Sequence, residues 1–186
     1  MAVFLVIDDS PDDRELVVRT LGRTSAFGDT EVIEAEDVEA GRGLLMRGGI
    51  DCLLLDYSMP GENGLDFLVD IQLRFPELPV VMITGEGSER TAVDALKKGA
   101  LDYVVKGDIR PDTLEKAVVH AMDEKAQEVE ILRHANFDEL TGLPNRALLL
   151  DRLQDALHRA ARGESGVTVA SANPGCAMHL AGDPSL

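Results

Sequence analysis

Residues 52–68 read CLLLDYSMPGENGLDFL, which begins with an apolar run that ends in a carboxylate, Asp56. A short apolar run of this kind is typical of a strand buried on both faces, as in a parallel sheet. An ionised carboxylate inside such a core would be costly. The cost falls if Asp56 lies at the carboxyl end of its strand, where open α/β sheets form their ligand clefts. We therefore expect Asp56 to face a site at that edge of the sheet.

The sequence on either side of this run alternates short apolar segments with helical patterns. The expected strands are 3–7, 30–35, 52–55, 80–83 and 101–105. The expected helices are 11–21, 38–46, 65–75, 88–98 and one that begins at 111. Five repeats of strand and helix predict an α/β fold with a doubly wound, five-stranded parallel sheet.

Polar side chains follow four of these strands, and they are Asp8, Asp9, Asp56, Thr84 and Lys106. The carboxyl ends of parallel strands share one edge, so we expect these side chains to converge. Three neighbouring carboxylates repel one another unless a cation is present, and a hard divalent ion such as Mg²⁺ suits oxygen ligands. With the ion bound, Asp56 could attack phosphorus as a nucleophile. Thr84 and Lys106 could then donate to the phosphoryl oxygens.

Each of these residues also has a simpler explanation when it is taken alone. Asp8 or Asp9 could cap the helix that follows, and Asp56 could be a turn residue. Thr84 could be an N-cap, and Lys106 could be a solvated lysine at the end of a strand. Their joint placement at one edge of the sheet favours the functional interpretation.

Three segments of the chain resemble the receiver domain of two-component response regulators, over about residues 1–122: VIDDSPDDREL, LLLDYSMPGENGLDFL and VVMITGEGSERTAVDALKKGALDYVVK. The resemblance implies a flavodoxin-like receiver that takes a phosphoryl group on Asp56 from a sensor histidine kinase or a histidine phosphotransfer protein. The Mg²⁺ ligands that it implies are Asp8, Asp9, Asp56 and the backbone carbonyl of Ser58. The phosphoryl-binding and switch residues that it implies are Thr84, Tyr103 and Lys106.

The chain departs from the family at one of these positions. Receivers usually have a proline after this lysine, with a cis peptide that shapes the loop, whereas Gly107 follows Lys106 here. A cis bond before a residue other than proline costs about 2.5–4 kcal/mol. We therefore expect a trans or mobile loop. For Tyr103, plain packing in a strand beside a helix is the alternative to a switch role.

A long helix is expected from Pro111 to about Asn136, because this stretch has no glycine or internal proline and carries an apolar stripe. It extends the last helix of the receiver over residues 111–136. Two interpretations stay open. The helix is a packed receiver helix with a solvated extension, or it is a linker that forms a homodimer by pairing with a second copy in a weak coiled coil.

The segment FDELTGLPNRALLLDRL resembles the opening of the diguanylate cyclase (GGDEF) domain, which carries a D-x-L-T-G-L-x-N-R signature. The chain continues with VTVASANPGCAMHLAGDPSL, and no active-site loop of that family follows. We expect residues 137–163 to be a truncated N-terminal fragment of such a domain, through truncation or a frame change. Residues 164–186 are expected to be a disordered tail.

Composition limits the partners and the compartment. The chain has 34 acidic and 18 basic residues and a formal charge of -16, which disfavours nucleic acid and anionic membranes as partners. Two cysteines without metal-ligand spacing fit a reducing compartment. No apolar run approaches the length of about 18 residues that a membrane span needs. We expect a soluble cytoplasmic protein.

The expected function is a phosphorylation-dependent signalling module, in which the changed surface of the receiver is the output. We do not expect an enzyme, because the cyclase fragment lacks an active-site motif. One alternative is a diguanylate cyclase response regulator whose catalytic part is missing from this chain. The other is a dimer scaffold that works without phosphate.

Overall fold

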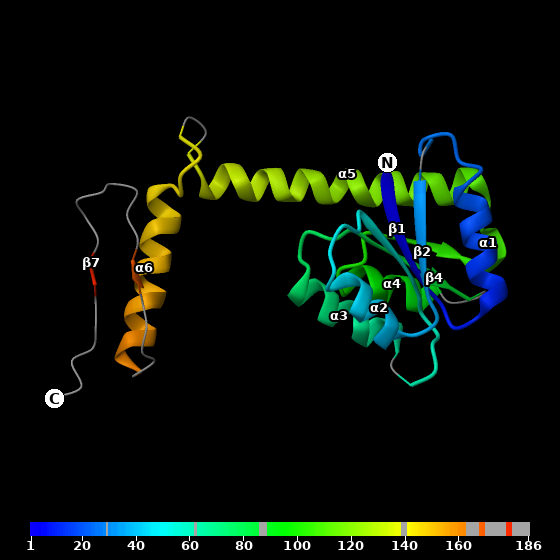
Figure 1. Ribbon diagram of the computed structural model, residues 1–186, viewed down its shortest axis with the longest axis horizontal. Helices are drawn as coiled ribbons and strands as arrows, with labels where there is room; N and C mark the ends of the chain where they lie inside the picture. The colour runs from blue at the N-terminus through cyan, green and yellow to red at the C-terminus, as the bar shows by residue number, and fades with distance from the viewer. Residues whose placement is uncertain are drawn as a thin grey trace. The chain divides into compact units, whose positions relative to one another are not determined.

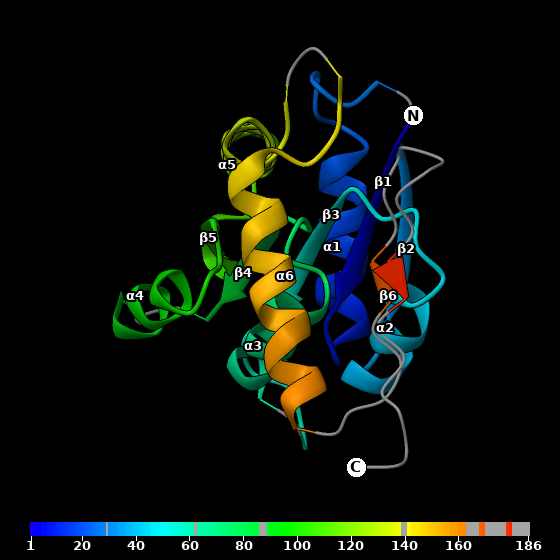
Figure 2. The ribbon, with the colours of Figure 1, turned by 90° about the vertical axis from the view of Figure 1, so that its left-hand side faces the viewer.

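Five short apolar strands and their connecting helices make up the first of the two units into which the chain divides, Met1–Val129. The computed structural model describes residues 1–28, 30–61, 63–85, 89–138, 141–162, 168–169 and 178–179. The strands are β1 (Ala2–Ile7), β2 (Thr30–Ala35), β3 (Cys52–Asp56), β4 (Val80–Thr84) and β5 (Asp102–Val105). They pair in parallel in the order β2-β1-β3-β4-β5, which Figure 2 shows from right to left. The predicted doubly wound parallel sheet is confirmed.

Helices cover both faces of this sheet (Figure 1). They are α1 (Pro11–Leu21), α2 (Val38–Leu45), α3 (Gly64–Arg74), α4 (Glu89–Lys97) and α5 (Pro111–Asn136). Apolar side chains of α2 and α3, with Ala95 of α4, form one hydrophobic core against the sheet. Those of α1 and the first part of α5 form the other. Because β3 and β4 are buried along their whole length, the sequence of both reads as an apolar run rather than an alternation.

Two strands, β3 and β4, end one residue later than the sequence predicts, and in both the additional residue is a predicted site residue. Asp56 and Thr84 are the last residues of β3 and β4, one residue beyond the expected ends. The reason is that Asp56 still pairs with Ile83, and Thr84 with Val105, in the ladder of the sheet. The backbone of both polar residues is therefore fixed by hydrogen-bonded neighbours.

The chain leaves β5 through a short turn of 3₁₀-helix, Lys106–Asp108. The peptide between Lys106 and Gly107 is trans, as the sequence predicts for a residue other than proline. Lys106 thus begins a compact turn that leads directly to α5.

The second unit, Glu130–Leu186, contains the end of α5 and the helix α6 (Arg146–Ala161). The turn between them is hydrogen-bonded: the Asn145 side chain donates to the Ala135 carbonyl oxygen over 2.6 Å. Within that turn the Thr141 N–H donates to the Asp138 carboxylate over 2.9 Å. α5 has the bounds expected for the extended helix.

Most of the segment 164–186, for which the sequence predicts disorder, lies outside the described residues. Its described parts are two short strands, β6 (Thr168–Val169) and β7 (Met178–His179), which pair in the antiparallel sense. Among all the residues that the structure describes, none of the helices is both long and apolar enough to span a bilayer.

Candidate functional site

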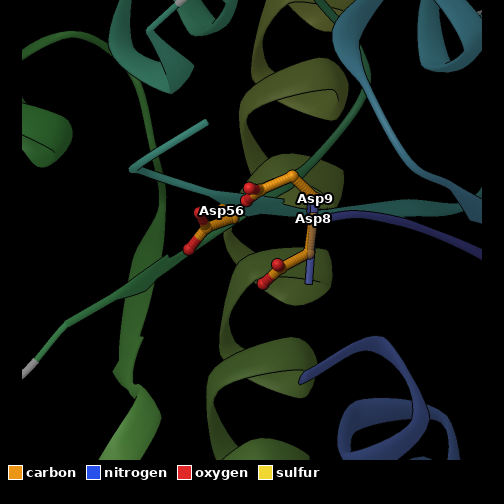
Figure 3. A group of neighbouring side chains, drawn as sticks. All are labelled: Asp8, Asp9 and Asp56. Carbon is orange, nitrogen blue, oxygen red and sulfur yellow. The ribbon is translucent and has the colours of Figure 1, made fainter. Parts of the chain in front are cut away.

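The candidate site lies where the order of the strands reverses. The chain passes from β1 to β2 on one side, while β3, β4 and β5 follow on the other side of β1. Ligands of open α/β sheets bind at such a switch point, outside the carboxyl ends of the strands. Asp8 and Asp9 directly follow β1, and Asp56 ends β3. One carboxylate oxygen from each of the three residues lies within 4.8 Å of the others, and Figure 3 shows the side chains gathered at this edge.

Two of the three carboxylates are buried, and the turns after their strands hold one oxygen of each. The Ser10 N–H donates to Oδ1 of Asp8 over 2.8 Å, and the Ser58 N–H donates to Oδ2 of Asp56 over 3.0 Å. Within the described part of the chain, the other oxygens, Oδ2 of Asp8 and Oδ1 of Asp56, have no hydrogen-bond partner. Asp9 is exposed. Each turn thus leaves one buried oxygen facing a cationic partner.

Lys106 is the cation that the chain itself provides. Its Nζ lies 2.9 Å from Oδ2 of Asp8 and 3.0 Å from Oδ1 of Asp56. Both contacts are ion pairs by distance. Nζ also donates a hydrogen bond of 2.7 Å to Oδ2 of Asp13. One ammonium therefore faces three carboxylates.

The pKa values of Asp56 and Lys106 reflect burial and the excess of carboxylates over ammonium groups at the site. Burial raises the pKa of Asp56; Lys106 opposes the rise and Asp8 adds to it, so the net shift is upward. For Lys106, burial alone would lower the pKa, but the carboxylates of Asp13, Asp8 and Asp56 outweigh burial and the pKa is raised. A single ammonium does not remove the cost of holding Asp56 ionised in this site.

The residues present fit a hard divalent cation. They offer only oxygen ligands, from three carboxylates within 4.8 Å of one another. Two of the oxygens are buried and without a hydrogen-bond partner in the described residues, a condition that is costly unless a charge compensates it. Mg²⁺ binds through one or a few carboxylates and retains several waters, so this donor set suits it.

The other predicted residues lie at the neighbouring strand ends. Thr84 ends β4, beside Asp56, and is buried. Tyr103 lies in β5 with Met82 as its register partner, and 39% of its surface is exposed. The structure places no hydrogen bond between Tyr103 and either Thr84 or Lys106. The switch roles of Thr84 and Tyr103, and the ligand role of the Ser58 carbonyl, stay predictions.

Gly64 allows the chain to return close to the backbone of Asp56 at the end of β3. A Cβ at Gly64 would lie 2.2 Å from the carbonyl oxygen of Asp56 and 3.0 Å from Cα of Tyr57. The Gly64 N–H donates to the Tyr57 carbonyl oxygen over 3.2 Å. Only glycine fits here, because any side chain would overlap the backbone at the end of β3.

Two site residues of α1 were not predicted from the sequence. Asp13 binds Lys106, and Arg14 donates to the carbonyl oxygen of Asp8 over 2.7 Å. Ser10 caps α1, because its hydroxyl accepts a hydrogen bond from the Asp13 N–H over 3.3 Å. The N-cap of this helix is therefore neither Asp8 nor Asp9. The sequence offers one signal for them: Asp13 and Arg14 lie in the first turn of a helix that starts at the edge of the site.

The comparison with known families agrees with this architecture. A parallel sheet in the order 2-1-3-4-5 is the flavodoxin-like arrangement, and the acidic cluster lies at its switch point. The profile of the response regulator receiver domain matches residues 4–120, more than half of the 186-residue chain. The chain belongs to the response regulator receiver domain family.

Individual relatives show how far the similarity extends. Response regulator protein PilR of Pseudomonas aeruginosa is 46% identical over 102 residues, which cover 55% of this chain and 22% of PilR. Chemotaxis protein CheY1 of Helicobacter pylori is 40% identical over 105 residues, 55% of this chain and 82% of CheY1. The crystal structure of the receiver domain of NtrX from Brucella abortus has a TM-score of 0.58 at 34% identity, over 64% of this chain and 98% of that one. The chain thus spans most of CheY1 but only about a fifth of PilR.

Proposed function

We propose that the chain is a two-component receiver that accepts a phosphoryl group on Asp56 from a phosphohistidine. The observation that carries this proposal is the position of Oδ1 of Asp56. This oxygen is buried and lacks a hydrogen-bond partner among the described residues, and it faces Lys106 beside two further carboxylates. A nucleophile of that kind needs charge compensation before it can approach an anionic phosphoryl group.

The proposed transfer is a displacement at phosphorus. A carboxylate oxygen of Asp56 forms the new P–O bond, the P–N bond of the phosphohistidine breaks, and its electron pair leaves with the imidazole. Mg²⁺ held by Asp8, Asp9, Asp56 and the Ser58 carbonyl would supply the positive charge that offsets repulsion between carboxylates and phosphoryl oxygens. Thr84 and Lys106 donate to the phosphoryl oxygens from the neighbouring strand ends.

The proposed output is a change of surface at the end of the sheet. Phosphorylation adds about 1.5–2 negative charges next to Thr84, and movement of Thr84 together with the half-exposed Tyr103 would alter the face formed by β5, α4 and α5. The partner that supplies the phosphoryl group is a sensor histidine kinase or a histidine phosphotransfer protein. The chemistry is self-phosphorylation of a cytoplasmic receiver, without nucleic acid or membrane as a partner.

For residues 137–163 we propose the N-terminal fragment of a diguanylate cyclase domain, without cyclase activity of its own. The hydrogen bonds of Thr141 to Asp138 and of Asn145 to Ala135 support the view that the signature residues build the turn between α5 and α6. Two copies of the chain would pair through the long helix α5, and the exposed leucines of α6, Leu149 and Leu157, also favour self-association. Sedimentation at several concentrations tests the homodimer, and a GTP turnover assay tests for cyclase activity.

The phosphoacceptor proposal is tested with beryllofluoride, a phosphoryl mimic, added together with Mg²⁺. A rise in melting temperature is expected for the wild type and not for Asp56→Asn. Equal melting temperatures with and without the mimic in both proteins would contradict the proposal and would favour the scaffold that works without phosphate.

A further inference from the structure

The shortest contact of Lys106 is with a residue outside the acidic cluster. Nζ lies 2.7 Å from Oδ2 of Asp13, compared with 2.9 Å to Asp8 and 3.0 Å to Asp56. Asp13 comes from the first turn of α1, not from a strand end. Its side chain is 32% exposed, and that of Lys106 is 25% exposed. The contact therefore lies at the rim of the site, where the buried carboxylates meet solvent.

The other two partners of Lys106 are buried carboxylates of the acidic cluster, Asp8 and Asp56. Oδ2 of Asp8 and Oδ1 of Asp56 are the buried oxygens without a hydrogen-bond partner in the described residues, and both residues belong to the cluster that fits a metal ion. A cation held by this cluster would compete with Lys106 for the two carboxylates and would repel its ammonium. Asp13 is not a member of the cluster, so its contact with Lys106 can persist.

The 3₁₀ turn Lys106–Asp108 fixes the backbone of Lys106 but not the end of its long side chain. A lysine side chain also loses much rotamer freedom when it is held in one position. The site therefore needs a side-chain contact that keeps the ammonium in place after the strand-end oxygens are occupied.

We propose that Asp13 is a positioning residue, which anchors the Lys106 ammonium beside Asp56 while the cation and the phosphoryl group are bound. This inference rests on the proposed function of Asp56. The ammonium has three N–H donors; one stays with Asp13, and the others turn from the carboxylates of Asp8 and Asp56 to the phosphoryl oxygens.

A matched pair of variants separates this role from the effect of charge. Asp13→Asn removes the anchor, while Asp12→Asn removes the same charge from the same turn of α1. The Asp12 side chain is exposed and makes no hydrogen bond or ion pair in the described part of the chain. With acetyl phosphate at saturating Mg²⁺, we expect Asp13→Asn to be phosphorylated about tenfold more slowly than the wild type, because the lysine is displaced. Asp12→Asn should keep the wild-type rate, and Asp13→Glu should recover most of it.

A second measurement does not depend on the reaction. In protein labelled with ¹⁵N at the lysine side chains, the Lys106 ammonium gives an NMR signal only when it is held and protected from exchange. The signal can be assigned with Lys106→Arg. With Mg²⁺ and beryllofluoride we expect this signal in the wild type and in Asp12→Asn, and its loss in Asp13→Asn.

The outcomes of these experiments distinguish the proposed function of Asp56 from the proposed anchoring role of Asp13. Absence of phosphorylation in the wild type would overturn the proposed function, and the anchor with it. A phosphorylated wild type together with equal rates and equal Lys106 signals in Asp13→Asn and Asp12→Asn would overturn the anchor alone. A slow Asp13→Asn rescued by Asp13→Glu, with the Lys106 signal lost only in Asp13→Asn, supports it.

Discussion

Nζ of Lys106 lies 3.0 Å from Oδ1 of Asp56, so an ion pair joins the ends of β5 and β3 across the strand that separates them, β4. The same ammonium also pairs with Asp8 and Asp13. The receiver therefore concentrates negative charge at one edge of its sheet, where the Lys106 ammonium faces three carboxylates.

Replacement of that cation should destabilise the protein. For Lys106→Met measured in EDTA, we expect the free energy of unfolding to fall by about 1–3 kcal/mol, because the buried carboxylates of Asp8 and Asp56 lose their neutralising partner. Lys98→Met is the control: its 3.8 Å contact with Asp66 is exposed, and its loss should change stability by less than about 0.5 kcal/mol. Urea denaturation compares the two, and equal stabilities of Lys106→Met and wild type would contradict the expectation.

The raised pKa of Asp56 predicts a specific pH dependence in the absence of metal. At pH values between the ordinary pKa of 3.8 and the raised pKa of the folded state, Asp56 is protonated more fully in the folded protein than in the unfolded protein. The Asp56 contribution to stability is therefore largest at low pH, and it falls as the pH rises through the folded value. The difference in unfolding free energy between the wild type and Asp56→Asn, measured in EDTA across this range, should shift in favour of Asp56→Asn as the pH increases. A difference that does not vary with pH would contradict the raised pKa.

Gly64 should tolerate no side chain. In Gly64→Ala the new Cβ would lie 2.2 Å from the Asp56 carbonyl oxygen, so the backbone must shift, and we expect a loss of about 2 kcal/mol or more. Gly43→Ala is the matched control, since it lies inside α2 and a Cβ there meets nothing within 4 Å. That change should stabilise the protein by about 0.5–1 kcal/mol. Similar melting temperatures for the two variants would contradict the close approach.

Metal binding should depend on Asp9, the exposed member of the cluster. Mg²⁺ that binds only the folded state stabilises it by mass action, so the wild type should melt at a higher temperature as Mg²⁺ is added. Asp9→Asn should lose most of this increase, because it removes one of three clustered carboxylates. Asp12→Asn, which removes an exposed charge outside the cluster, should retain it. If Mg²⁺ raises the melting temperature of Asp9→Asn as much as that of the wild type, Asp9 does not contribute to metal binding.

The sequence was sufficient for the sheet and for the strand-end residues. Apolar runs that end in Asp56 or Thr84 identify buried parallel strands, and parallel strands bring their carboxyl ends to one edge. The positions of Asp8, Asp56 and Lys106 follow from that rule, and the structure brings these three side chains into contact.

The sequence was not sufficient for residues whose role depends on the rotation of a helix. Asp13 and Arg14 look like ordinary charged residues in a first helical turn, and only the docking of α1 on the sheet turns them toward Lys106 and Asp8. The ends of β3 and β4 were also predicted one residue short, because polarity at Asp56 and Thr84 indicates a strand end while the hydrogen-bonded ladder continues through both residues.

The central claim, that Asp56 is the phosphoacceptor, is tested most directly by the mass of the intact protein after incubation with acetyl phosphate and Mg²⁺. We predict that the wild type gains the mass of one phosphoryl group, that EDTA prevents the gain, and that Asp56→Asn does not show it. A wild type that gains no phosphoryl group, or an Asp56→Asn variant that gains one at the wild-type rate, would contradict the account.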